Sequence, residues 1–496
     1  MMSFYSKRLP VVRSLLFGCL IIALLFLLGA CSPRSAEVSE LSVFRWDLTL
    51  DQHDAVAKAI AGRFGLRFRA ISAPWASWPD KLNAMIASGD VPDVFVGYGI
   101  MDGPTYKRWA HDGILLPVSD YAAPYPSLSA YLSRFKDQTV DSTGKLYSIP
   151  VEDYVDHVLM IRGDWLEELG LPPPKTIDEL YATAVAMRDR YHITPISSSP
   201  AHTSGFFWLN FLFYAYGSAW DDWVETSDGT YVPSWIADGS RDALEYIHRL
   251  YHQHLLDPDF PTLTDGQKEE RFANGKAGIV ANGDLPGFRA ALAKASPKAR
   301  LVVLPPPSGP KGQGMWGLNG YFSSVMIRKG LDGQRRDKFL AFMDFLHSKE
   351  ADELFTYGVS GVDYRRGPTP GSHEPLHLAS DGVATPLASS EPSINLRFLG
   401  ALEWRWMPSW DSSYSDEQTA VEIGKRYSRP SRFPYVILPT ATQRGQQLQD
   451  FVFGSYVKMV LSADPVAAQW DGFVKQYLDL GGRQLIDEMK TRLAAT

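Results

Sequence analysis

Strand patterns and helix patterns alternate along the amino-terminal third of this chain, and this alternation limits its fold more than any other feature. Residues 41–46, 66–70 and 91–96 form short strand patterns, whereas 51–64 and 80–88 repeat apolar residues at helical spacing. Parallel strands need a crossover connection of a dozen or more residues, which is usually a helix. The order strand, helix, strand, helix, strand therefore predicts an α/β protein with a parallel sheet.

A second region with the same alternation begins at residues 147–151. A helix pattern follows near Trp165, and Thr176 with Glu179 forms a capping box that opens the next helix. Further helices are expected at 241–254, 267–273 and 336–347, and further strands at 277–281, 301–304 and 321–327. The chain has 496 residues and so exceeds the ~250–300 at which a single hydrophobic core stops growing. At least two lobes are expected.

The first 30 residues are typical of a secretory signal. Three basic residues precede an uncharged apolar stretch at 15–30, which ends in small residues. This stretch is shorter than the ~20 residues that span a bilayer comfortably, so an uncleaved anchor is the less favoured alternative. The sequence Leu28-Gly29-Ala30-Cys31 resembles a bacterial lipobox, in which Cys31 is diacylated and becomes the new amino terminus. Residues 31–40 are expected to form a flexible leash.

The cysteine count and the charge exclude several classes of protein. The only two cysteines are Cys19 and Cys31, so the folded body has no intrachain disulfide and no cysteine-based metal site. With 49 basic and 56 acidic side chains the chain is mildly acidic, which argues against a nucleic-acid-binding surface.

Metal binding would have to use histidines and carboxylates. His248 and His252 are spaced by one helical turn, with His254 and Asp257 nearby, so a zinc site is an alternative to exposed helix histidines. Residues 188–195 lack the ladder of carboxylates that a calcium loop needs. We expect no metal and no cofactor.

One nucleotide-binding motif occurs, but the residues around it do not have the pattern of a nucleotide-binding site. Residues 312–317 fit G-x-G-x-x-G, but they follow a proline-rich loop and lead into a strand pattern rather than a helix. The sequence contains no G-x-x-x-x-G-K-[ST], H-E-x-x-H or G-x-S-x-G motif. These patterns give no support to a dehydrogenase, an NTPase, a zinc protease or an α/β-hydrolase.

Four ordered stretches carry a resemblance to a known family. They read KLNAMIASGDVPDV at 81–94, YSIPVE at 147–152, FANGKAG at 272–278 and YGVSGVDY at 357–364. In this order, and together with the lipobox, the stretches resemble the extracellular solute-binding proteins of ABC importers. They are most similar to the family 1 sugar-binding type, which includes maltodextrin-binding proteins and the larger lipoproteins of Gram-positive bacteria.

The resemblance implies a two-lobed periplasmic-binding-protein fold of the class II type, with a mostly parallel sheet in each lobe and the ligand between the lobes. Lobe one would comprise 38–150 and 305–347, and lobe two would comprise 151–304 and 348–496. Ligands of open parallel sheets lie outside the carboxyl ends of the strands, and pockets favour domain interfaces, so both arguments give the same location.

The candidate ligand-binding residues are aromatic or acidic side chains near strand ends, together with tryptophans that could stack on a sugar ring. They are Trp46, Asp47, Tyr98, Glu152, Tyr154, Trp208, Asp284, Trp316, Trp404 and Trp406, with Asn282, Trp220 and Trp410 as further candidates. The resemblance places acidic ligand contacts near Asp47 and Glu152, and a tryptophan where this chain has Asp284-Leu285-Pro286. Alternatively, each acidic residue is a helix cap and each tryptophan belongs to the core.

The expected function is capture of a carbohydrate, in particular an oligosaccharide, and its delivery to an ABC transporter permease. The protein would be a monomer, held by palmitate-type acylation of Cys31 on the extracytoplasmic face of a bacterial cell membrane, without nucleic acid as a partner. One alternative is a surface glycoside hydrolase, for which Asp221 and Asp222 are the most suggestive acidic pair. Adjacent residues on one strand point to opposite faces, however, so they form a poor catalytic couple. A binding protein for a peptide, polyamine or iron ligand is the other alternative.

Overall fold

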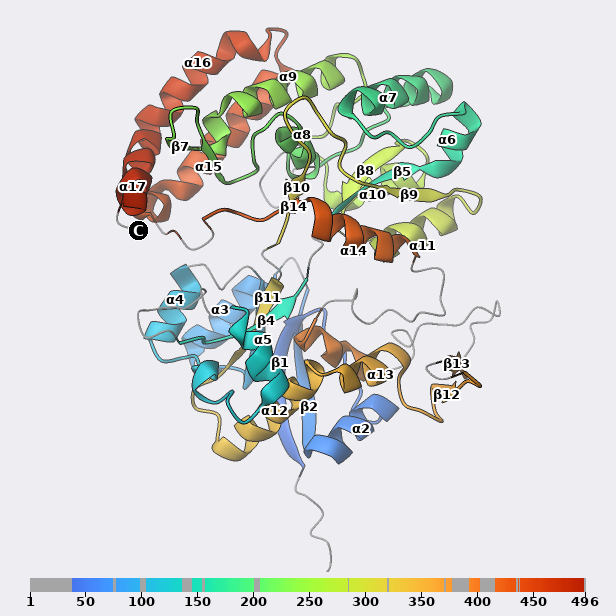
Figure 1. Ribbon diagram of the computed structural model, residues 1–496, viewed down its shortest axis with the longest axis vertical. Coiled ribbons are helices and arrows are strands. Elements are labelled where there is room, and N and C mark those ends of the chain that lie inside the picture. Colours follow the sequence, from blue (N-terminus) through green and yellow to red (C-terminus); the bar gives the residue numbers. More distant parts are fainter. Residues whose placement is uncertain are drawn as a thin grey trace, which may run out of the picture.

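The computed structural model of the protein describes most of the chain from residue 38 onward. The described residues are 38–74, 77–98, 104–135, 145–153, 157–199, 206–283, 285–318, 321–369, 372–376, 392–401, 415–433, 436 and 438–494. Two separate clusters of buried apolar side chains divide them into a first and a second lobe. Figure 1 shows the first lobe below and the second lobe above.

The first lobe is built on a five-stranded sheet in the order β2-β1-β3-β11-β4. Its strands are β1 (Ser39–Trp46), β2 (Leu66–Ala73), β3 (Val94–Tyr98), β4 (Ile149–Glu152) and β11 (Tyr321–Ile327). β1 runs parallel to β2 and β3, whereas β11 is antiparallel to both β3 and β4. The predicted strand-helix alternation and the mostly parallel sheet are therefore confirmed in this lobe.

Helices cover the first sheet, and the sequence sets the ends of several of them. They are α2 (Ala55–Phe64), α3 (Trp78–Ser88), α4 (Pro104–His111), α5 (Pro126–Ser133), α12 (Gly333–Leu346) and α13 (Lys349–Tyr357). Asp54 caps α2 by accepting a hydrogen bond from the backbone of Ala57, and Gly65 ends the helix in the left-handed conformation with φ of 61°. A small hairpin of β12 (Tyr364–Arg366) and β13 (His373–Pro375) follows α13.

The second lobe contains a three-stranded sheet in the order β8-β5-β9. β5 (Val158–Arg162) is antiparallel to both β8 (Ile279–Asn282) and β9 (Leu301–Leu304). The expectation of a mostly parallel sheet is wrong for these pairs. The reason is that β5 enters from the side of the first lobe, soon after β4 ends, whereas β8 and β9 both end on that side.

The second lobe also holds most of the helices and two further pairs of short strands. The helices are α6 (Gly163–Leu169), α7 (Ile177–Tyr191), α8 (Asn210–Ala215), α9 (Asp238–His252), α10 (Asp265–Ala273), α11 (Leu285–Ala295), α14 (Ser415–Tyr427), α15 (Pro439–Leu461), α16 (Val466–Tyr477) and α17 (Arg483–Ala494). β6 (Trp223–Glu225) pairs with β7 (Tyr231–Pro233), and β10 (Met315–Trp316) pairs with β14 (Ser428–Arg429). The predicted capping box is present at the start of α7, between Thr176 and Glu179.

Residues after 348 are divided between the lobes, although the sequence placed 348–496 in lobe two. Ala351 and Phe355 of α13, together with Leu396 and Ala401, belong to the core of the first lobe. α13 begins only two residues after α12 ends, and this short link keeps it against the same sheet. Helices α14–α17 lie in the second lobe (Figure 1).

The segment that carries the expected signal, Cys31 and the start of the leash lies outside the described residues. In the part of the chain that the structure describes, each helix is too short or too polar to cross a bilayer.

Candidate functional site

The two sheets present strand ends toward the region where the chain passes between the lobes. β4 ends at Glu152 and β5 begins at Val158, while β9 ends at Leu304 and leads through β10 to β11. β4 and β11 lie at the top of the first lobe and β10 and β14 at the bottom of the second (Figure 1). The carboxyl ends of β1, β2, β3, β4, β8 and β9 therefore face the connections, together with the amino ends of β5 and β11. Ligands of α/β sheets are expected at the carboxyl ends of the strands.

Trp46 lies at the carboxyl end of β1 and is largely buried, with 5% of its surface exposed. Its ring centroid lies 5.4 Å from that of Trp78, and the Arg45 guanidinium lies 4.7 Å from the Trp46 ring. Asp47 follows with a φ of 49° and an exposed side chain. The left-handed turn at Asp47 thus separates a packed tryptophan from an open carboxylate.

Glu152 ends β4 opposite Tyr321 of β11, and it also forms a bridge with Ala401. Its carboxylate accepts a hydrogen bond of 3.0 Å from Arg134. Arg134 follows helix α5 and its guanidinium lies over the ring of Tyr131. Arg134 was not predicted from the sequence, because a helix pattern does not indicate which strand end the helix meets.

In the second lobe, four rings form a group that we call the aromatic wall, made of His157, Phe207, Trp208 and Trp316. The ring centroid of Phe207 lies 5.1 Å from His157, 5.0 Å from Trp208 and 5.6 Å from Trp316. Asn210 joins them: its side-chain nitrogen donates to Nε2 of His157 at 2.8 Å, and its oxygen accepts from the Trp316 backbone at 2.8 Å. The structure thus brings the predicted Trp208 and Trp316 together.

Asp265 and Lys268 contact Trp208 and hold its side chain in place. The Trp208 indole donates a hydrogen bond of 2.9 Å to Asp265, which also accepts from Ser199. Lys268 has no exposed surface; its ammonium lies 3.5 Å from the Trp208 ring centroid, 3.3 Å from Asp265 and 3.0 Å from the Ala281 carbonyl. Burial lowers the pKa of Lys268 to about 7, although Asp265 opposes the shift. These contacts fix the orientation of Trp208.

Several residues of the aromatic wall and its support were missed by sequence reasoning. Phe207, Asn210, His157 and Lys268 were not among the sequence-based candidates. A buried lysine on an otherwise polar helix face gives no periodic signal, because its burial depends on an aspartate and a carbonyl from other elements. Asn282, a predicted candidate, is buried and donates to Glu269 at 3.0 Å.

Of the remaining candidates, only Trp220 and Tyr98 lie in the part of the chain that the structure describes. Trp220 is a core residue whose ring centroid lies 5.0 Å from that of Trp235, so the core interpretation holds for it. Tyr98 ends β3 opposite Ser323. Five candidates lie outside the described residues, namely Tyr154, Asp284, Trp404, Trp406 and Trp410.

The histidines on α9 contact a backbone carbonyl. Nε2 of His248 and Nε2 of His252 lie 3.0 and 2.7 Å from the Ser462 carbonyl oxygen, and Asp257 pairs with Arg271. Among the described residues, no three acidic, histidine or cysteine side chains gather closely enough to hold a metal ion.

The glycine motif at 312–317 serves chain packing. A Cβ on Gly312 would lie 2.6 Å from the Tyr214 carbonyl oxygen, and one on Gly317 would lie 2.2 Å from the Ser428 side chain. The motif runs into β10 rather than a helix, so its glycines allow the chain to pass closely beside α8 and β14.

Comparison with known proteins places these observations in a family. The family described as "Bacterial extracellular solute-binding protein" matches residues 51–353. The polygalacturonan/rhamnogalacturonan-binding protein YtcQ of Bacillus subtilis (strain 168) is 26% identical over 429 residues, covering 84% of this chain and 83% of YtcQ. Lipoprotein LipO of the same organism is 23% identical over 461 residues, covering 87% of each chain.

A solved structure gives the same fold. The alginate-binding protein AlgQ2, in its structure without calcium ion, superposes with a TM-score of 0.63 at 20% identity. The match covers 91% of this chain and 97% of AlgQ2. The expected two-lobed solute-binding fold is therefore confirmed.

Proposed function

This chain belongs to the bacterial extracellular solute-binding protein family, and we propose that it captures a carbohydrate, in particular an oligosaccharide, and delivers it to the permease of an ABC importer. The observation that carries the proposal is the aromatic wall beside the chain crossings. Aromatic faces stack on the C–H side of sugar rings, while amides and carboxylates exchange hydrogen bonds with hydroxyl groups. The similarity to YtcQ, a polygalacturonan/rhamnogalacturonan-binding protein, and to AlgQ2, an alginate-binding protein, supports this ligand class.

We propose that the ligand lies between the lobes and contacts the strand ends of both sheets. On the second lobe Trp316 is the leading candidate because it is only half-buried, whereas Trp208 is 8% exposed and supports the wall. On the first lobe Asp47 and Glu152 offer carboxylates, while Trp46 acts mainly through packing. The proposed set also keeps the candidates whose side chains are not described, namely Tyr98, Tyr154, Asp284, Trp404 and Trp406.

The family is one of binding proteins, and we propose that this member releases its ligand unchanged. The alternative glycosidase pair gains no support from the geometry, because Asp222 already accepts hydrogen bonds from Ser431 and the backbone of Arg432. Such a carboxylate serves to fix the loop before α15.

A thermal-shift screen of the purified protein tests the ligand class. Oligosaccharides, monosaccharides, peptides and polyamines are compared at equal concentration. A ligand at 100 times its Kd should add about 2.7 kcal/mol to the free energy of unfolding. Chromatography of the recovered sugar should show it intact. Stabilisation by peptides or polyamines alone would contradict the carbohydrate proposal, and cleavage products would favour the glycosidase.

We further propose that Cys31 anchors the protein to the extracytoplasmic face of the cell membrane. The similarity to lipoprotein LipO supports this expectation. A single acyl chain binds membranes only marginally, whereas two chains hold stably. The Cys31→Ser variant should therefore move from the membrane fraction to the soluble extracytoplasmic fraction. If the variant stays in the membrane fraction, the lipobox interpretation is wrong.

A further inference from the structure

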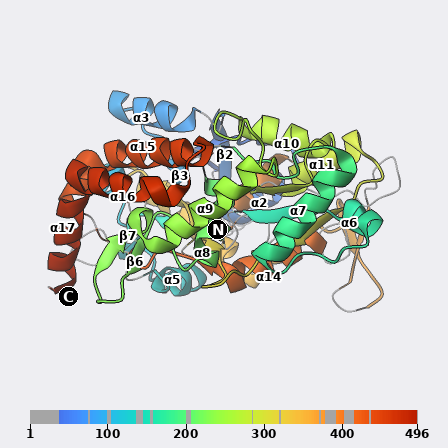
Figure 2. The ribbon, with the colours of Figure 1, turned by 90° about the horizontal axis from the view of Figure 1, so that it is seen from above.

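A pocket of about 320 Å³ lies in the second lobe between the β6–β7 hairpin and the carboxyl-terminal helices. Its described lining comes from residues 221–235, α15, the end of α16 and α17, and it includes none of the four rings of the aromatic wall. β7, α15, α16 and α17 gather at one end of this lobe in both views (Figures 1 and 2). The pocket is thus separate from the proposed carbohydrate site.

The pocket is aromatic and acidic. Trp223 and Trp235 supply ring surface, and Asp221 and Asp222 supply two carboxylates. None of the described lining residues is a lysine, an arginine or a histidine. A ligand that enters this pocket therefore meets an excess of negative charge beside aromatic rings.

The carboxylate of Asp222 is satisfied by protein groups, but two other polar groups at the pocket are not. Within the described part of the chain, no hydrogen bond or ion pair is made by the Asp221 carboxylate. The side chain of Tyr477 is only 2% exposed, and its hydroxyl also has no hydrogen-bond partner there. Because this hydroxyl is not sealed off from the pocket, it is available to a bound molecule.

The surroundings of Asp221 favour a cation in particular. The Asp221 side chain is exposed at the pocket. Desolvation by the surrounding protein, together with the adjacent Asp222, raises the pKa of its carboxyl to about 6. A neutral sugar would supply hydrogen bonds but leave the carboxylate charge uncompensated. A cation would neutralise it and would also gain attraction from the tryptophan faces.

We propose that this pocket binds a small organic cation, whose ammonium group pairs with Asp221 and whose apolar part lies against Trp223 and Trp235. Gln449 and the Tyr477 hydroxyl supply further hydrogen-bonding groups at the same pocket. The site is a second one, independent of carbohydrate capture.

Ligand-observed NMR on the whole chain tests the site with tetramethylammonium, tert-butanol and methyl glucoside at constant ionic strength. tert-Butanol is an uncharged molecule of similar size to tetramethylammonium. Tetramethylammonium should bind more tightly than either neutral probe, and Asp221→Asn should raise its Kd at least about tenfold. Trp223→Ala should also weaken it. Asp450→Asn, which removes an exposed carboxylate from α15, is the matched control and should leave the Kd unchanged.

Two results would overturn the proposal. One is equal binding of the three probes with no effect of Asp221→Asn, and the other is the absence of tetramethylammonium binding. The Trp316→Ala variant separates this site from the carbohydrate site, because it should leave tetramethylammonium binding intact. Carbohydrate binding should in turn survive Asp221→Asn.

Discussion

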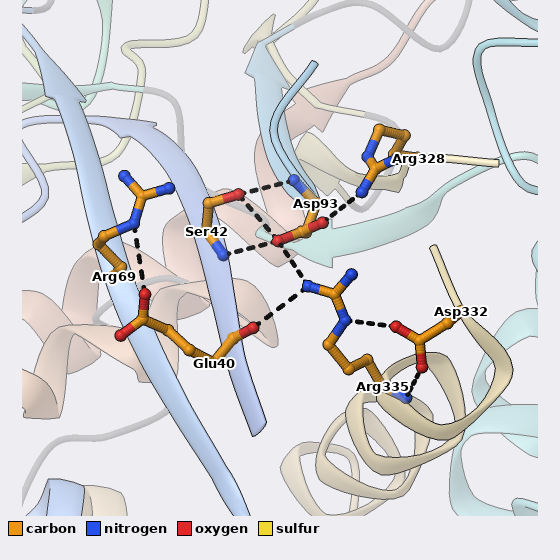
Figure 3. A network of polar contacts seen from close by, with 7 residues as sticks. All are labelled: Glu40, Ser42, Arg69, Asp93, Arg328, Asp332 and Arg335. Atoms are coloured by element: carbon orange, nitrogen blue, oxygen red, sulfur yellow. Dashed lines mark hydrogen bonds and ion pairs between the residues drawn. The ribbon is translucent and has the colours of Figure 1, made fainter. Parts of the chain in front are cut away.

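Asp93 joins several elements at the end of the first sheet away from the second lobe. Its carboxylate accepts hydrogen bonds of 3.0 Å from the backbone and the hydroxyl of Ser42 on β1, and one of 2.6 Å from Arg328 after β11. Arg335 of α12 lies 3.5 Å away. Figure 3 shows these groups converging on the carboxylate from three elements. A single buried carboxylate thus ties β1, β3, β11 and α12 together.

Asp93→Asn should lower the free energy of unfolding by about 2 kcal/mol, because hydrogen bonds to a charged group are lost and Arg328 keeps an uncompensated charge. Urea unfolding measures this change. Glu350→Gln is the matched control, since the Glu350–Arg63 pair is exposed and should contribute little. Equal effects of the two substitutions would show that the Asp93 contacts add no stability.

The same carboxylate predicts acid sensitivity. Burial alone would raise the pKa of Asp93, but the hydrogen bonds from Arg328 and Ser42 outweigh it and lower the pKa below its usual value. A lowered folded-state pKa contributes stability above the ordinary aspartate pKa of about 4, and this contribution is lost as the pH falls below it. The difference in stability between the wild type and Asp93→Asn should therefore shrink in unfolding experiments between about pH 5 and pH 3.

Trp316 is the residue that tests the carbohydrate site most directly. Trp316→Ala should weaken binding of the best oligosaccharide by at least about 2 kcal/mol, or about 30-fold in Kd, because truncation of an aromatic hot spot removes stacking surface. Calorimetry measures the loss. Tyr191→Ala, which truncates a half-buried ring stacked on Trp165, is the control and should change Kd less than about twofold. If Trp316→Ala raises the Kd no more than the control does, the carbohydrate site does not include Trp316.

At the scale of elements, α14 is the first helix that the structure describes after residue 401, which lies in the first lobe. One ion pair fixes its position. Glu417 has no exposed side-chain surface and pairs with Arg289 of α11, one of whose contacts measures 3.0 Å. The pair therefore docks α14 on α11 and sets where β14 meets β10 beside Trp316.

Glu417→Gln should destabilise the protein by about 3 kcal/mol, because it removes the buried carboxylate charge that Arg289 contacts most closely. The double variant Arg289→Met with Glu417→Met should recover most of this loss, since apolar replacement of a buried pair is often neutral. Urea unfolding of both variants, with Glu422→Gln on the exposed face of α14 as control, measures the coupling. A double variant as unstable as the single one would show that the charge is not the cause.

At the scale of the whole molecule, a ligand that binds between the two lobes should favour the conformation in which the lobes are closed around it. Each sheet edge offers only part of the contacts, so the closed arrangement binds the ligand more tightly and its population rises. Small-angle scattering should show a smaller radius of gyration with saturating oligosaccharide than without it. A sugar that gives no thermal shift is the control. An unchanged radius with a tightly bound sugar would contradict a site between the lobes.

The sequence by itself determined the local features of this protein. The alternation of strand and helix patterns predicted an α/β fold, and Thr176 with Glu179 predicted the start of α7. Each depends on residues within one element, so spacing alone is sufficient. The failure of the glycine motif as a nucleotide site was equally local, because the strand that follows it is visible in the sequence.

Only the tertiary structure decided which distant residues meet. It made β5 antiparallel to its neighbours, placed α13 with the first core, buried Trp220, and joined Asn210 to His157 and Trp316. The charge on Lys268 gave no hint of its burial beside Trp208. Such contacts connect segments tens to hundreds of residues apart, and their free energy depends on the packing of whole elements. A pattern of residue types specifies the faces of an element but not its partner, so the second pocket around Asp221 emerged only from the folded lobe.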